Sequence, residues 1–313
     1  GINLFNPHLI LDSVSGVRKT GHPQSFDWRE PWWKEYQILN EYFTRLSKIM
    51  TEGKRKAEIL LLHPTTTWFL KRPAEVEGNI LWDYEKMNDD SPIKTYIGKI
   101  QQWTEAGMEF DLGDEFLIEK YGMVQNGKLC VGEACYSMVY IPKEMKHIRS
   151  ATKQLLEHAT DQGVRIMMEE ESVVYMDGEV QSSPVLCFPL CGPDQMIRYA
   201  VKKGTIPVVT SGSGITVSRR VLEGGVSRFF FINSTPQKRY LHTALEGKTV
   251  RQIDLFGDAL KPYPYKQKDN SCEVEISLES GGSLLLESRI DNSLSGTYEK
   301  DNVKLNSACS TAD

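Results

Sequence analysis

The chain has 313 residues, of which 37 are basic and 42 are acidic, giving a formal net charge of −5. A chain of this length is typical of about two domains. The charges are mixed along the sequence without the basic stripe that follows a phosphate backbone, which excludes nucleic acid as a partner. Apolar runs are far shorter than the roughly 20 residues of a membrane-spanning helix, which excludes a membrane partner.

The cysteines show neither a Cys-x-x-Cys pair nor a histidine at zinc-ligand spacing. We therefore expect free thiols, although pairing of some of them stays open, and we predict no metal site and no cofactor. The sequence has no basic-then-apolar leader, which favours the cytoplasm but is equally what an internal fragment would show. The six cysteines are at positions 130, 135, 187, 191, 272 and 309.

The sequence opens on an apolar, strand-like run, "INLFNPHLIL", directly after Gly1. A hydrophobic strand needs a sheet to sit in, and nothing precedes it. We therefore expect the chain to be the downstream part of a longer protein. An unpaired strand at residues 2–12 would also be a contact for a second copy, so a homo-oligomer is a possible state.

Strand and helix patterns then alternate for about 150 residues, which predicts an open, mostly parallel sheet with helices on both faces. Short aliphatic runs such as "AEILLL" are typical of buried parallel strands. The glycines and alternating apolar residues of "GKLCVGEACYSMVYIP" predict a hairpin that leads into a buried strand. Helices are expected at 33–50, 92–107, 148–162 and 194–204, and strands at 57–62, 137–141 and 164–169.

From residue 215 the pattern changes to short alternating runs separated by turns rich in glycine, proline and asparagine. Such a pattern predicts a small antiparallel β domain of the sandwich type. After residue 290 the sequence becomes polar, and we expect a tail without a core.

Three catalytic classes of the doubly wound sheet are not supported. A cysteine or serine hydrolase needs its nucleophile on a glycine-flanked elbow between strand and helix, and neither Cys130, Cys135 nor Ser213 has that context. Dinucleotide binding needs a glycine-rich turn after the first strand, where this chain has "HPTTTWFL". Carboxylate chemistry stays open, because "FDLGDEF" at 110–116 carries three acids, whereas the glutamates of "MEEES" at 168–172 predict a solvated loop.

Several stretches together resemble the segment that follows the catalytic barrel in bacterial glycoside hydrolases of the α-L-rhamnosidase type. The likeness covers residues 1 to about 289 and depends on the order of the segments more than on any one of them. Its residues are "HPQSFDWREPWW", "NEYFTRLSKIMTEGKRKAEILLLHPTTTWF", "FDLGDEFLI", "GKLCVGEACYSMVYIP", "RFFFINSTPQKRYLHTALEG" and "SLESGGSLLLES".

The resemblance implies a fold class: an α/β domain with a flavodoxin-like or amidotransferase-like, mostly parallel open sheet, followed by a small antiparallel β-sandwich. Residues 1–32 would be the last barrel strand and its linker, 33–212 the flavodoxin-like domain, 213–290 the β domain and 291–313 the polar tail. Because nearly the whole barrel is absent, the family's catalytic acids have no counterpart, and no residue of this chain is predicted to be catalytic.

The resemblance therefore implies the accessory part of a bacterial glycosidase that hydrolyses terminal O-glycosidic bonds. Its partners would be a carbohydrate and the missing barrel, which would also hold any calcium ion. The alternative is a carbohydrate-binding or protein-interaction module without an enzymatic parent, in which exposed tryptophans and the crevice at the switch point of the sheet form the site.

Three residues are candidate sugar contacts. By the resemblance, His8 would stand at the rim of the barrel, where such enzymes keep their sites. Trp28 would lie on the adjoining link. It is a candidate because an aromatic ring can stack on a sugar. His63 ends a predicted strand at the edge where open sheets bind ligands. Trp32 and Trp33 are instead expected to pack.

Overall fold

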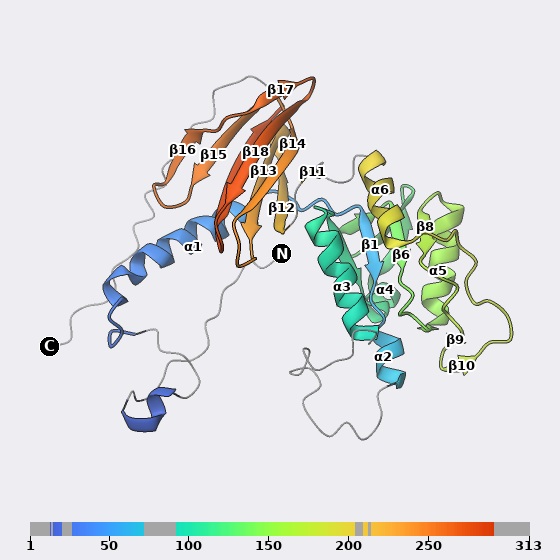
Figure 1. The fold of residues 1–313 in the computed structure, drawn as a ribbon. Helices are drawn as coiled ribbons and strands as arrows, with labels where there is room; N and C mark the ends of the chain where they lie inside the picture. Colours follow the sequence, from blue (N-terminus) through green and yellow to red (C-terminus); the bar gives the residue numbers. More distant parts are fainter. Residues whose placement is uncertain are drawn as a thin grey trace.

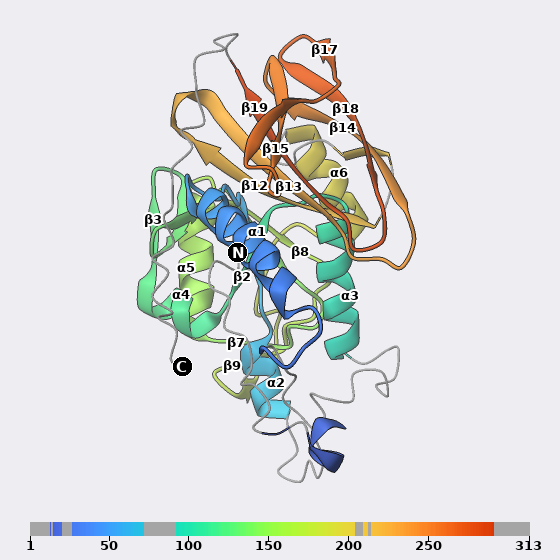
Figure 2. The same ribbon diagram turned by 90° about the vertical axis from the view of Figure 1, so that its left-hand side faces the viewer.

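The computed structural model describes residues 13, 15–20, 27–71, 92–203, 209–211 and 214–290. Figures 1 and 2 show two parts: an α/β unit (residues 57–71 and 92–203) and a layer of antiparallel strands, the β layer (209–211 and 214–290). His8, the expected strand at 2–12, the expected tail at 291–313 and Cys309 lie outside the described residues.

The α/β unit is built on a parallel sheet of four strands in the order β2-β1-β6-β8. All four residues of β1 and of β6 are buried, as expected of strands covered on both faces. This sheet confirms the predicted alternation of strand and helix. The strands are β1 (Ile59–Leu62), β2 (Phe110–Gly113), β6 (Met138–Ile141) and β8 (Arg165–Met168).

Helices cover the two faces of the sheet, and successive residues of β1 point to opposite faces. Ile59 and Leu61 pack in the cluster of α3 (Pro92–Glu105) and α6 (Pro193–Lys203). Leu60 and Leu62 pack in the cluster of α4 (Glu115–Tyr121) and α5 (Ser150–Asp161). Short α2 (Thr65–Lys71) follows β1 directly.

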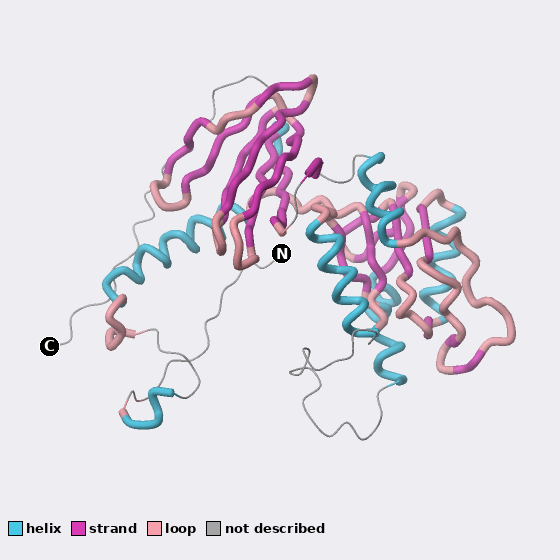
Figure 3. The backbone as a smooth tube through the Cα atoms, in the orientation of Figure 1, coloured by secondary structure: helices cyan, strands magenta, loops and turns pink. Residues whose placement is uncertain are grey.

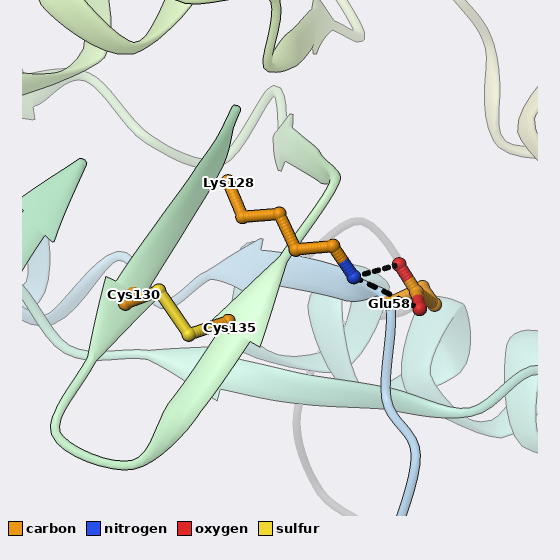
Figure 4. The surroundings of a disulfide bond; sticks show 4 residues. All are labelled: Glu58, Lys128, Cys130 and Cys135. Atoms are coloured by element: carbon orange, nitrogen blue, oxygen red, sulfur yellow. Dashed lines mark hydrogen bonds and ion pairs between the residues drawn. A yellow bond between two sulfur atoms is a disulfide. The ribbon is translucent and has the colours of Figure 1, made fainter. Parts of the chain in front are cut away.

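A disulfide closes the hairpin of β4 (Lys128–Val131) and β5 (Ala134–Tyr136) in the α/β unit, which corrects the expectation that Cys130 and Cys135 are free thiols. The hairpin itself was predicted. Its register places the two cysteines directly opposite each other, with Cα atoms 4.0 Å apart (Figure 4). No spacing rule reveals such a pair, because only the hairpin register brings it together.

Short strands complete the α/β unit. One small sheet has the order β3-β4-β5 and a second has the order β10-β9-β7. These strands are β3 (Gly122–Gln125), β4 (Lys128–Val131), β5 (Ala134–Tyr136), β7 (His147–Ile148), β9 (Tyr175–Met176) and β10 (Glu179–Val180).

The β layer contains two antiparallel sheets, in the orders β12-β13-β19-β15-β16 and β11-β14-β18-β17. Alternate residues of both sheets, among them Phe229, Phe231, Leu241 and Ile276, share one apolar cluster. The change from helices and strands to strands alone is visible in Figure 3. The strands are β11 (Val209–Ser211), β12 (Ile215–Leu222), β13 (Val226–Asn233), β14 (Arg239–Glu246), β15 (Thr249–Asp254), β16 (Ala259–Pro262), β17 (Lys266–Lys268), β18 (Ser271–Leu278) and β19 (Ser283–Arg289).

Helix α1 (Tyr36–Thr51) packs on the β layer, although the sequence grouped residues 33–50 with the α/β domain. Ile49 lies in a cluster with Phe230 and Leu285, and the Arg228 guanidinium donates to the Ile49 carbonyl over 3.2 Å. The chain joins the two parts where Lys54 and Val221 exchange backbone hydrogen bonds of 2.9 Å. Helical periodicity predicts an apolar stripe but not the surface that covers it.

Candidate functional site

The carboxyl ends of the parallel strands bring six polar side chains to one edge of the sheet. The connections from β1 and from β2 lead to opposite sides of β1, so the order of strands reverses there, which is where open α/β sheets commonly bind ligands. We call this group the carboxyl-edge site. Its members are His63, Thr65, Lys99, Asp114, Glu144 and Glu169.

Three of these residues form a hydrogen-bonded chain from the end of β1 to the start of α4. His63 Nδ1 lies 2.7 Å from the Thr65 hydroxyl, and that hydroxyl lies 2.9 Å from Asp114 Oδ2. A carboxylate only accepts, so the Thr65 hydroxyl donates to Asp114 and accepts a hydrogen bond from the Nδ1–H group of His63. The second oxygen of Asp114 accepts from the backbone N–H groups of Phe116 and Leu117. Asp114 is therefore the N-cap of α4, and the chain ties two elements together.

Burial lowers the pKa of His63 below its ordinary value of 6.5, although the nearby Asp114 carboxylate opposes the shift. The imidazole packs edge-on against Trp68 and Tyr96, with ring centroids 4.8 and 5.4 Å away. The Tyr96 hydroxyl donates to the Leu62 carbonyl over 3.2 Å. His63 is therefore a neutral histidine in an aromatic setting near neutral pH, with its Nδ1 proton already used.

Lys99 of α3 forms a buried ion cluster with Glu144 and Glu169, which follow β6 and β8. The Lys99 ammonium lies 2.7 Å from Glu144 Oε2 and also binds Glu169 Oε2. Lys99 is only 5% exposed and Glu144 only 4%. Two carboxylates share one ammonium here, and Glu144 is buried together with Lys99, whereas Glu169 is partly exposed.

Sequence reasoning did not select Lys99 or Glu144. A signal existed for Lys99, which lies on the face of α3 that carries the buried Tyr96 and Trp103. A cation on an apolar face needs a buried partner, and this pattern points to an acid on a neighbouring element. No comparable signal marks Glu144.

The acids of "FDLGDEF" do not converge on one pocket. Asp111 pairs with Arg55 and accepts from the Tyr136 hydroxyl over 3.0 Å, while Asp114 caps α4. Glu115 is fully buried and accepts from the backbone N–H of Arg149 over 2.9 Å. Burial raises the pKa of Glu115 above its usual range.

The "MEEES" acids are likewise divided. Glu169 belongs to the buried ion cluster, whereas Glu170 and Glu171 are exposed. The prediction of a solvated loop is therefore wrong for Glu169, because Lys99 on α3 compensates its charge.

No contact among the described residues joins Trp28 to the carboxyl-edge site. The Trp28 side chain is 75% exposed. Trp33 stacks on Tyr36 with ring centroids 5.5 Å apart, and both Trp32 and Trp33 remain partly exposed. Of the three candidate sugar contacts, His63 alone is placed in a described network.

Two kinds of feature are absent from the described part of the chain. None of its helices has both the length and the apolar character to cross a membrane. Across the same residues, no group of three or more histidine, cysteine, aspartate or glutamate side chains comes together as a metal site.

No protein-family model matches the sequence, and no curated protein matches it. Solved structures do match the fold. A rhamnosidase from Novosphingobium sp. PP1Y superposes with a TM-score of 0.60 at 12% identity, over 85% of this chain and 26% of that one. A catalytic mutant of the GH42 β-galactosidase Gan42B from G. stearothermophilus gives 0.55 at 12% identity, over 88% and 47%.

A β-galactosidase from Bacillus circulans sp. alkalophilus gives a TM-score of 0.52 at 11% identity, over 84% of this chain and 46% of that one. The class that these likenesses define is a glycosidase-related fold. This chain spans between 26% and 47% of the length of the three enzymes. At such identities the likeness concerns the fold alone, and it does not single out the rhamnosidase type.

Proposed function

We propose that this chain is a non-catalytic accessory part of a glycoside hydrolase of the α-L-rhamnosidase type. Hydrolysis of terminal O-glycosidic bonds would be carried out by another part of such an enzyme, and this part would buttress it and flank the sugar. The fold likeness to portions of glycosidases supports the proposal. On this proposal the α/β unit is the flavodoxin-like domain and the β layer a sandwich module.

The observation that carries the proposal is that the acids discussed above in the described α/β unit already bind other groups of the protein. A glycosidase needs two carboxylates that flank an accessible bond, one of them able to donate a proton. Here Glu144 and Glu169 share a buried ammonium, Asp114 caps a helix and Asp111 binds Arg55. Each of these carboxylates therefore has a structural partner in place of a substrate.

Hydrolysis of nitrophenyl glycosides tests the proposal. The purified chain is expected to release no nitrophenol from nitrophenyl α-L-rhamnoside or β-D-galactoside above the rate of a heat-denatured sample. Glu144→Gln and Glu169→Gln chains serve as matched controls. Release by the native chain that either substitution abolishes would contradict the accessory role and would place catalysis in the ion cluster.

The exposed Trp28 favours a second candidate, a carbohydrate-binding module without an enzymatic parent. An exposed indole can stack on the apolar face of a sugar ring. Quenching of the chain's fluorescence by rhamnose or galactose, lost in Trp28→Ala and kept in Trp33→Ala, would support this candidate. No change with either sugar would remove it.

A further inference from the structure

A second polar region lies at the opposite edge of the parallel sheet, where the strands begin. A cavity of about 560 Å³ opens there between the α/β unit and the β layer. Its volume lies within the range of small-molecule sites in proteins. The walls are the amino ends of β1, β6 and β8, the last turns of α6, and strand β12. The lining residues are Lys56, Glu58, Ser137, Met138, Gly163, Arg165, Tyr199, Lys203 and Arg219.

Four cations and one carboxylate line the cavity. The carboxylate, Glu58, already has partners. Lys128 Nζ lies 3.1 Å from one of its oxygens (Figure 4), and the Ser137 hydroxyl donates to it over 2.8 Å. Its charge is therefore neutralised by a residue outside the lining. Arg219 is paired with Glu246, and the three other cations leave the cavity with an excess of positive charge, which favours an anionic ligand.

Arg219 of β12 provides a buried donor in this wall. Arg219 is 8% exposed, and its Nη2 lies 2.8 Å from Glu246 Oε2. Its Nε has no hydrogen-bond partner among the described residues. This Nε is enclosed by the protein, so a ligand in the cavity does not reach it.

Two further cations are held beside an aromatic ring. The Arg165 guanidinium lies 4.8 Å from the centre of the Tyr199 ring, and the Lys203 ammonium lies 6.0 Å from it. Both residues are exposed and line the cavity, so their donors remain able to bind an oxyanion.

We propose that this cavity binds a sugar that carries a carboxylate or a sulfate ester. The cations would hold the charged group, with Arg165 suited to bind two of its oxygens at once. Ser137 and Tyr199 add hydroxyl groups to the lining. That the ligand is a sugar rests on the proposed function, whereas the requirement for an anion rests on the lining residues alone.

Isothermal titration calorimetry of the purified chain tests the proposal with four probes: D-galacturonate, D-galactose 6-sulfate, D-galactose and inorganic sulfate. Arg165→Ala and Lys203→Ala remove cavity cations whose side chains are exposed, so both variants are expected to fold. Lys202→Ala is the matched control, because Lys202 is an exposed neighbour on α6 that does not line the cavity.

We expect the two charged sugars to bind at least about tenfold more tightly than D-galactose or sulfate. Arg165→Ala should weaken galacturonate binding about fivefold and Lys203→Ala about threefold, as expected for charge-assisted contacts that are partly screened by water. Lys202→Ala should leave it unchanged, and high salt should weaken it.

Equal binding of galacturonate and galactose, or equal losses in Lys202→Ala and Lys203→Ala, would overturn the proposal. Binding of inorganic sulfate as tight as that of the charged sugars would overturn its saccharide part. Nitrophenol release depends on none of these side chains, so failure here and failure of the proposed function are distinguishable.

Discussion

The two edges of the parallel sheet use charged residues in opposite ways. At the carboxyl edge His63, Thr65 and Asp114 bind one another, and Lys99 is enclosed between two carboxylates. At the amino edge several cations line an open cavity. Topology marks the carboxyl edge as the usual ligand site of such sheets. We infer that the pairing of charged groups with one another, and not topology alone, bears on which edge binds a ligand.

The largest expected effect concerns the ion cluster at the carboxyl edge. Lys99→Met would leave Glu144 and Glu169 buried without a cation, and should lower the free energy of unfolding by about 4 kcal/mol. Urea unfolding followed by circular dichroism measures this change. Glu144→Gln, which keeps the Lys99–Glu169 pair, should cost much less. Equal stability of Lys99→Met and the native chain would show that the cluster does not stabilise this edge.

The next effect concerns the β layer, whose strand β12 forms one wall of the amino-edge cavity. Ile49 of α1 is buried against this layer, so Ile49→Ala should lower the free energy of unfolding by about 3 kcal/mol through a cavity. Hydrogen exchange should speed up in β13 and β19 more than in β6. Ile38→Ala on the exposed face of α1 is the control and should change stability by less than about 0.5 kcal/mol. Faster exchange confined to β6 would place α1 with the α/β unit.

The stability of the chain should depend on pH through Glu109, which lies at the amino end of β2. Burial raises the pKa of Glu109 from 4.5 to about 7, although Arg219 and Arg55 oppose the shift. The folded state then binds more protons than the unfolded chain between these pH values, so stability falls as pH rises through this window. This loss of stability is complete above about pH 7 and absent below about pH 4.5.

Glu109→Gln removes this titration and keeps an oxygen for the Arg219 backbone N–H, which lies 3.1 Å from Glu109 Oε1. The variant should be about 2 kcal/mol more stable than the native chain at pH 8 and equal to it near pH 4.5. Thermal unfolding across this range measures the difference. A constant difference at every pH would contradict a raised pKa.

The smallest effect concerns the hydrogen-bonded chain of the carboxyl edge. Thr65→Val removes the hydroxyl between His63 and Asp114 and should cost about 1 kcal/mol. Thr65→Ser keeps the hydroxyl and should therefore retain most of the stability that Thr65→Val loses. Nitrogen NMR of His63 should show the Nδ1–H tautomer in the native and serine chains. A tautomer that is the same in Thr65→Val would show that Thr65 does not select it.

Much of the fold followed from the sequence, because periodicity and turn residues report burial directly. The aliphatic run at 57–62 became a buried parallel strand, and the alternating runs after 215 became antiparallel sheets. What the sequence could not reveal was the exact register within a hairpin, or which surface covers a helix. Cys130 with Cys135 needed the hairpin register, and α1 needed the β layer that covers it.

The candidate site followed only in part. The position of His63 at the end of β1 was predictable, since a strand that meets proline must end there. Its tautomer depends on Asp114, which reaches it through the pairing of β1 with β2. The amino-edge cavity combines residues as distant as Lys56 and Arg219, and no local pattern indicates it.

Hydrogen–deuterium exchange with and without D-galacturonate tests the contrast between the two edges most directly. We predict protection of peptides that contain residues 163–168 and 199–203, at the amino edge, and no change in peptides that contain 63–71 and 142–148. Protection at 63–71 and 142–148, with none at 163–168 and 199–203, would contradict the account and return the binding site to the carboxyl edge.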